Sequence, residues 1–212
     1  METPDGPPTA KVAILYYSAT GNIAAMAHAL GAGARDIGAD VRVHRVAETA
    51  PDAAVEANPR WRAFVETNED PLATLEDLTW ADGIAIGSPT RFGAPAAQMK
   101  AFLDTTGGLW AHGALAEKVC TAFTSSSTAH GGLESTILAI NNHFYHWGSL
   151  IMPLGYRDPH VMKVTGNPYG ASFVSRKGSS PDEDSLTAAR VQGEQLASVT
   201  STMLAGRSMR GQ

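Results

Sequence analysis

The chain has 212 residues, of which 43% are hydrophobic and 17% are charged, and its net charge is -5. These values are typical of a single domain that builds its own core. The mild acidity and the absence of basic clusters argue against a nucleic-acid or anionic-membrane surface and indicate a small-molecule partner.

The chain termini and the cysteine content give further limits. Residues 1–10 carry three prolines and no apolar stretch, which predicts a disordered arm rather than a signal peptide. No run approaches the roughly 20 apolar residues of a membrane span. The single cysteine, Cys120, excludes an internal disulfide, fits a reducing cytoplasm, and lies in a strand-like run where a buried packing role is favoured over a reactive thiol.

Strand and helix patterns alternate along the chain. Strands are predicted at 12–17, 41–46, 83–88, 119–124 and 150–154. Helices are predicted at 23–37, after Pro95, at about 133–147, and from about 181 to 204. This order predicts an α/β domain with a parallel sheet covered on both faces. Residues 50–80 and 156–181 do not fit this plan, and we expect them to form excursions near the ligand face or a subunit contact.

The first strand ends in Ser18-Ala19-Thr20-Gly21-Asn22-Ile23, which opens the first helix. A strand-to-helix turn rich in hydroxyls and glycine offers free amides and the positive end of a helix dipole to a phosphate. An ordinary capped helix start is the alternative. The turn contains no Lys or Arg, and it lacks the Walker and dinucleotide spacings. Gly31 to Asp36 begins like a dinucleotide fingerprint but falls within the predicted helix.

Two further polar loops follow central strands, at Gly87 to Pro95 and at Thr124 to Gly132. In a doubly wound sheet, ligands bind beyond the carboxyl ends of the strands. We therefore expect these loops and the Ser18 turn to converge on one site.

Together these segments resemble the WrbA group of flavodoxin-like NAD(P)H:quinone oxidoreductases. The resemblance rests on the Ser18 turn, Pro89-Thr90-Arg91-Phe92-Gly93, Gly107-Gly108-Leu109-Trp110, the Ser/Thr-rich loop ending in Gly131-Gly132, His146, and Asn167 to Ala171. It covers about 11–205, which leaves 206–212 as a tail. It implies a flavodoxin-like three-layer sandwich whose five parallel strands lie in the order 2-1-3-4-5.

The resemblance also implies FMN as the bound cofactor, NADH or NADPH as the donor, and a quinone as the acceptor. Residues 18–23 would bind the phosphate, 89–93 would flank the isoalloxazine ring, and 125–131 would line its other edge. His146 matches a histidine that contacts flavin in a neighbouring subunit of a homotetramer. The residues assigned to FMN are Ser18, Ala19, Thr20, Gly21, Asn22, Ile23, Pro89, Thr90, Arg91, Phe92, Gly93, Ser125, Ser126, Ser127, Thr128, Ala129, His130, Gly131 and His146.

The substrate position is assigned to Thr20, Trp110 and His146. Thr20 departs from the aromatic residue often found there, and the 129–133 run is less glycine-rich and about one residue longer than the family's. Trp110 has a core or interface role as its alternative, and His146 has an interaction with the last carbonyls of its helix.

The expected reaction is a ping-pong transfer of two electrons from NAD(P)H to a quinone, with no catalytic side chain, because hydride transfer is the chemistry of the flavin. The histidines share no metal-ligand spacing, so no metal site is expected. The alternatives are a flavodoxin-type single-electron carrier, which is usually more acidic, and a regulatory protein that has lost flavin.

Overall fold

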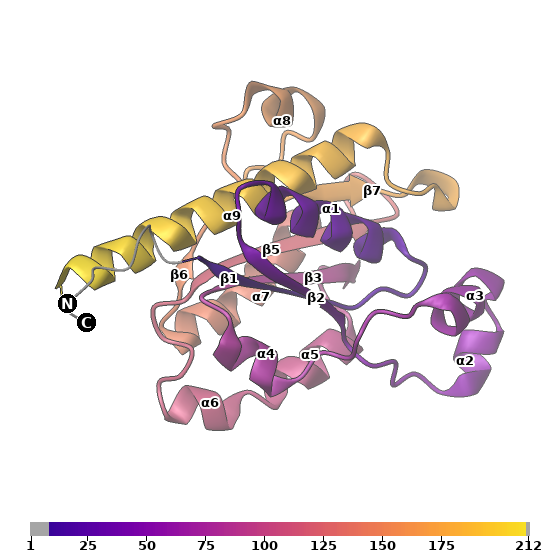
Figure 1. Cartoon of the computed structure of the whole chain (residues 1–212). Helices are drawn as coiled ribbons and strands as arrows, with labels where there is room; N and C mark the ends of the chain where they lie inside the picture. Colours follow the sequence, from indigo (N-terminus) through magenta and orange to yellow (C-terminus); the bar gives the residue numbers. More distant parts are fainter. Residues whose placement is uncertain (1–8, 211–212) are drawn as a thin grey trace.

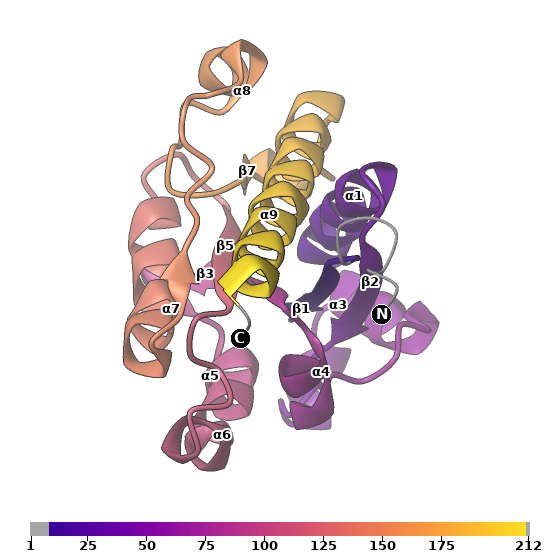
Figure 2. The ribbon, with the colours of Figure 1, turned by 60° about the vertical axis from the view of Figure 1, so that its left-hand side comes forward.

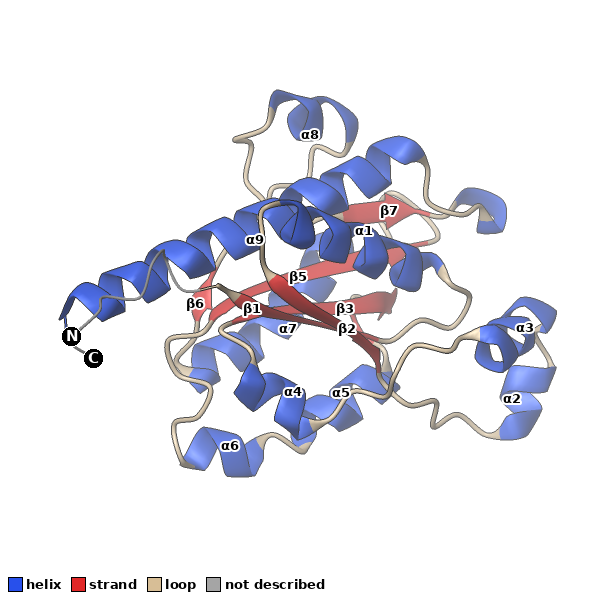
Figure 3. Cartoon of the chain, viewed as in Figure 1, coloured by secondary structure: helices blue, strands red, loops and turns tan. Residues whose placement is uncertain are grey.

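The computed structural model describes residues 9–210, and its centre is a parallel sheet. In spatial order the sheet contains β2 (Asp40–Arg45), β1 (Lys11–Tyr16), β3 (Gly83–Arg91), β5 (Val119–Ser126) and β6 (Leu150–Ile151). This arrangement confirms the predicted strand order (Figure 3). Strands β3 and β5 run two or three residues past their predicted ends, so 89–91 and 125–126 are strand ends rather than loops.

The predicted fifth strand, Leu150 to Leu154, is wrong in its length. The sheet position beside β5 is divided between β6 and β7 (Ser172–Val174), which pairs with the carboxyl half of β5. Pro153 has no amide hydrogen to continue the ladder. The chain leaves the sheet there, forms α8 (Pro159–Val164), and returns to pair as β7. A two-residue strand, β4 (Ala94–Pro95), folds back antiparallel on β3.

Helices cover both faces of the sheet, as Figures 1 and 2 show. On one face lie α1 (Asn22–Asp36) and α9 (Glu183–Arg210). On the other lie α4 (Leu75–Trp80), α5 (Ala97–Asp104) and α7 (Leu133–Trp147), with the short α6 (Gly107–Ala111) after α5.

The two cores contain alternate side chains of each central strand. In β1, Val12, Ile14 and Tyr16 face α1 and α9, whereas Ala13 and Leu15 face the other layer. All five are fully buried, as a central strand covered on both faces requires. Cys120 is buried in β5, and burial raises the pKa of its thiol to about 12, which confirms the predicted packing role.

Helices α1 and α9 cross at two glycines. A Cβ atom added to Gly33 would lie 2.0 Å from the carbonyl oxygen of Arg190, and one added to Gly193 would lie 1.9 Å from that of Leu30. Only glycine permits this backbone approach, so Gly33 belongs to a helix crossing rather than to a nucleotide-binding loop. Helix α9 continues to Arg210, past its predicted end, so residues 206–210 are helical rather than a separate tail.

The predicted excursion at 50–80 contains α2 (Asp52–Glu56), α3 (Pro59–Thr67) and α4. Residues 1–8 of the predicted arm lie outside the described residues. Ala10 is buried, and its carbonyl accepts a hydrogen bond from the amide of Asp40. Between residues 9 and 210, no helix is long and apolar enough to cross a membrane, and no cluster of three potential metal ligands occurs.

Candidate functional site

The loops after β1, β3 and β5 converge on one cavity of about 490 Å³. This volume lies within the roughly 300–1,000 Å³ that is usual for small-molecule and cofactor sites. The site lies beyond the carboxyl ends of the strands, as the sequence predicted. The lining residues are Ser18, Ala19, Thr20, Asn22, Ile23, Asn58, Arg60, Trp61, Pro89, Thr90, Arg91, Ser125, Ser126, Ser127, Ser175 and Gly178.

The turn at 18–23 leaves the start of α1 open to a ligand. Its N-cap is Gly21, which adopts the left-handed region at φ 92° and has no side chain to accept bonds from the first-turn amides. The Ser18 hydroxyl instead accepts a 3.0 Å hydrogen bond from the amide of Gly21, which shapes the turn. The geometry therefore favours an anion site over an ordinary side-chain-capped helix start.

Thr90, near the end of β3, joins this strand to the loop after β5. Its hydroxyl donates to the carbonyl of Gly131 (3.2 Å) and accepts from the amide of Gly93 (3.1 Å) and from the hydroxyl of Thr136 (2.8 Å). The hydroxyl thus uses its one donor and both acceptor positions. The loops after β3 and β5 touch here, because a Cβ on Gly132 would come within 2.7 Å of the Gly93 Cα. Thr90 sets the spacing between two walls of the cavity.

A third wall comes from α3, part of the 50–80 segment that we expected near the ligand face or a subunit contact. Asn58 caps this helix, accepting bonds from the amides of Arg60 and Trp61, and Pro59 occupies its first turn. An asparagine followed by proline is a helix-start signal, so the helix itself was readable from the sequence. The sequence did not reveal that α3 contributes to the cavity, or that Ser175 and Gly178 do.

The carboxylate of Glu48, in the loop after β2, links the end of β1, helix α3 and helix α5. Its Oε2 atom accepts from the hydroxyl of Tyr17 and the indole of Trp61, both at 2.8 Å. Its Oε1 atom accepts from Gln98 (2.6 Å) and from the backbone amides of Thr49 and Ala50 (2.9 and 2.8 Å). Burial raises the pKa of this carboxyl, but the hydrogen bonds from Ala50, Gln98, Tyr17 and Trp61 outweigh burial and hold the pKa below its ordinary value. Burial and the bond to Glu48 raise the pKa of Tyr17.

Not every predicted site residue lines the cavity. Gly21, Gly93 and Thr128 to Gly131 belong to its loops without lining it, and Phe92 has a fully exposed side chain on a backbone with φ 54°. Trp110 and His146 line a second cavity of about 360 Å³ between α6 and α7. In Figure 1, α6 lies at the lower left and α3 at the far right.

The alternative role of His146, an interaction with the last carbonyls of its helix, is not supported by the backbone at the end of α7. Gly148, in the left-handed region, and Ser149 donate their amides to the carbonyls of Tyr145 and Phe144. This backbone cap satisfies those carbonyls, so His146 has no need to cap them.

A doubly wound parallel sheet with an open phosphate turn after its first strand, and a cavity where the strand order reverses, defines the flavodoxin-like class. Comparisons with solved structures agree. A flavodoxin, WrbA-like protein from Agrobacterium tumefaciens superposes with a TM-score of 0.66 at 24% identity, covering 92% of this chain and 99% of that one. A flavodoxin from the domain Archaea has a TM-score of 0.59 at 21% identity, covering 90% and 98%.

Sequence comparison narrows the class. Residues 10–157 match the family model of NADPH-dependent FMN reductases. The NAD(P)H dehydrogenase (quinone) of Deinococcus radiodurans is 42% identical over 195 residues, 92% of this chain and 97% of that protein. That of Azorhizobium caulinodans is 45% identical over 194 residues, 89% and 96%. The chain belongs to the NAD(P)H dehydrogenase (quinone) family, which confirms the resemblance to the WrbA group and makes the protein an NAD(P)H-dependent, FMN-using oxidoreductase.

Proposed function

We propose that the protein reduces quinones to hydroquinones with NADH or NADPH, transferring two electrons at a time in ping-pong order. The observation that carries this proposal is the cavity at which the open phosphate turn, the end of β3 and the end of β5 meet. One cavity suits two substrates that occupy the same place in succession.

The residues present fit FMN. The uncapped start of α1 and the hydroxyls of Ser18 and Thr20 suit its phosphate. Residues 89–93 would flank its ring, and residues 125–131 would line the opposite edge. When bound, FMN supplies the hydride-transfer chemistry that amino-acid side chains lack.

The chain's own groups bind and orient. Backbone amides and the Arg91 guanidinium at the cavity wall would stabilise negative charge on the reduced ring. Thr20 would contact the nicotinamide. No acid or base is assigned to the reaction, and Glu48, whose carboxylate already accepts five hydrogen bonds, holds the walls in place.

Trp110 and His146 would act in a homotetramer. Both line the second cavity, away from the phosphate turn, and Trp110 is 56% exposed. We infer that they complete the substrate pocket of a neighbouring copy. Exposed side chains support a subunit contact: Tyr145 on the same helix as His146, Tyr156 before α8, and Met162 within α8. Analytical ultracentrifugation of the protein tests this assembly, and a monomer at micromolar concentration would refute it.

We place the protein in the cytoplasm, because a single free thiol fits a reducing compartment.

The test is an anaerobic absorbance trace of the FMN-loaded protein, with NADH or NADPH added first and benzoquinone second. We expect the visible flavin band to bleach and then to recover fully, with one hydroquinone formed per nucleotide and no quinone radical in the EPR spectrum. If neither nucleotide bleaches a flavin that dithionite reduces, a single-electron carrier is favoured. A protein that stays colourless after refolding with FMN would favour a binding protein without flavin.

A further inference from the structure

Helix α3 packs directly on the phosphate turn. A Cβ atom added to Gly21 would come within 3.3 Å of the Phe64 ring, so this ring covers the turn at its N-cap. Arg60 precedes Phe64 by four residues in α3, and residues with this spacing lie on the same face of a helix. Arg60 is therefore directed to the side of α3 that faces the turn, and it lines the cavity together with Ser18 and Thr20.

The guanidinium of Arg60 is available to an anion. Its Nη1 atom donates to the carbonyl of Gly178, which ties α3 to the 3₁₀ helix η1 (Arg176–Gly178) across the cavity. No carboxylate of residues 9–210 lies within ion-pair distance of it. A guanidinium has five N–H donors, so most remain for a ligand. Its neighbour Arg62, in contrast, pairs with Glu56 and Glu66.

The charge of the cavity also favours an anionic ligand. Arg60 and Arg91 line the cavity, and no acidic residue of the part of the chain that the structure describes lines it. The cavity is therefore positively charged, although the net charge of the whole protein is -5. Arg91 is the last residue of β3, and its guanidinium donates to the Thr90 carbonyl. Arg60 is thus the cation on the side of the phosphate turn, whose own residues 18–23 are all neutral.

We propose that Arg60 is a specificity-determining residue that binds a phosphate monoester dianion, that of FMN, together with the amides of the turn. A guanidinium offers two parallel N–H donors that match the oxygens of a phosphate. Arg60 bound in this way also keeps its contact to Gly178 and fixes α3 over the cofactor. This inference rests on the assigned FMN cofactor, but not on quinone reduction.

The test compares FMN with riboflavin, which lacks the phosphate. Dissociation constants are measured by quenching of flavin fluorescence for the full-length wild type, R60Q, R60K and the matched control R62Q. We expect R60Q to weaken FMN binding by roughly ten- to a hundredfold, the range for one charge-assisted hydrogen bond, and to leave riboflavin binding almost unchanged. R60K should recover part of the loss, and R62Q should behave as wild type. The salt dependence of FMN binding should also be weaker in R60Q.

Three outcomes would overturn the proposal. Equal losses for FMN and riboflavin would make Arg60 only a bridge to Gly178. Unchanged affinity for both flavins, with an unchanged KM for NADPH, would remove any role for it. If FMN binding is unchanged while the KM for NADPH rises and that for NADH does not, the dianion recognised is the 2′-phosphate of the donor. A wild type that binds FMN but fails to reduce quinones would refute the proposed function and leave this inference intact.

Discussion

The indole nitrogen of Trp61 donates a 2.8 Å hydrogen bond to Glu48, which fixes helix α3 to the loop after β2. Through the other oxygen of the same carboxylate, Gln98 joins α5 to this junction. The Glu48 side chain therefore positions α3, the cavity wall whose Trp61 follows Glu48 by 13 residues in the chain.

Glu48→Gln should destabilise the protein by about 1–2 kcal/mol, because an amide cannot accept from five donors. The pKa of Glu48 is lowered in the folded state. Its contribution to stability is therefore complete above the unfolded value, roughly 4.3, and is lost as the pH falls through the lower folded value. Urea unfolding at about pH 7 and about pH 4 measures this, and E48Q should show the smaller acid dependence. An identical acid dependence in both proteins would contradict the assignment.

Gly193→Ala should destabilise the protein by about 2 kcal/mol or more, because its Cβ would lie 1.9 Å from the Leu30 carbonyl oxygen and would force α1 and α9 apart. The matched control is Gly206→Ala in the same helix, where no atom lies within 4 Å of the added Cβ. Removing a helical glycine there should stabilise by roughly 0.5–1 kcal/mol. Thermal unfolding compares the two variants, and equal shifts in Tm would show that the crossing relaxes freely.

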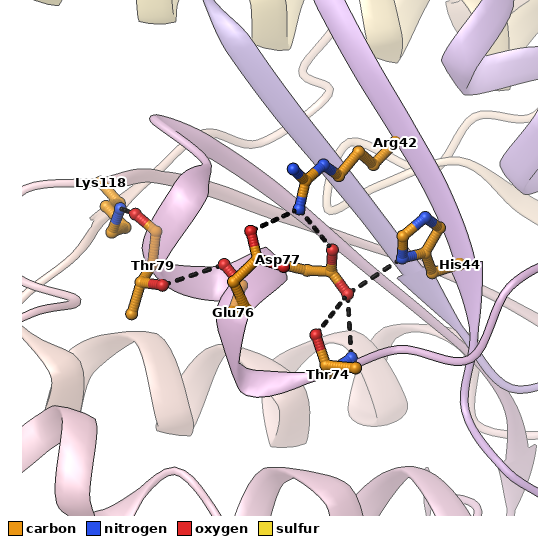
Figure 4. Close-up of polar contacts among 7 residues, drawn as sticks. All are labelled: Arg42, His44, Thr74, Glu76, Asp77, Thr79 and Lys118. Carbon is orange, nitrogen blue, oxygen red and sulfur yellow. Dashed lines mark hydrogen bonds and ion pairs between the residues drawn. The ribbon is translucent and has the colours of Figure 1, made fainter.

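Asp77→Asn should destabilise the attachment of the edge strand β2 to α4 by about 2–3 kcal/mol. Asp77 is buried and accepts from Arg42 (3.0 Å), His44 (2.9 Å) and the amide of Thr74 (2.9 Å), as Figure 4 shows. Burial raises its pKa, but these bonds outweigh burial and lower it, so this stabilisation is lost as the pH falls below about 3.9.

Glu76→Gln is the control for Asp77, because Glu76 contacts the same Arg42 at 3.1 Å but is 71% exposed. Its removal should change stability by no more than about 0.5 kcal/mol. Denaturant unfolding of the two variants separates the buried acceptor from the exposed ion pair. A loss in E76Q as large as in D77N would assign the effect to Arg42 alone.

Thr90→Val should weaken FMN binding by roughly tenfold, because three hydrogen bonds of its hydroxyl are lost: to Gly131 in the loop after β5, to Thr136 in α7, and to Gly93. Thr90→Ser keeps the hydroxyl and should retain most of the affinity. Equilibrium dialysis with FMN measures both variants. Binding by T90V that equals the wild type would show that the loops hold their spacing without this residue.

The sequence by itself determined the alternation of strands and helices, the polar turn at 18–23 and the convergence of three loops, and through the family resemblance it implied the sheet order. These depend on local information: apolar periodicity, turn chemistry, and the rule that parallel strands end at one edge. The family followed from short motifs for the same reason.

Only the tertiary structure decided which distant segments complete the cavity. Arg60 and Gly178 are 118 residues apart and meet across it, and β7 takes the sheet position that β6 leaves after Pro153. It also set Trp110 and His146 apart from the phosphate turn. No local pattern encodes such contacts, because they depend on where each excursion returns to the sheet and on which side chains close packing then brings together.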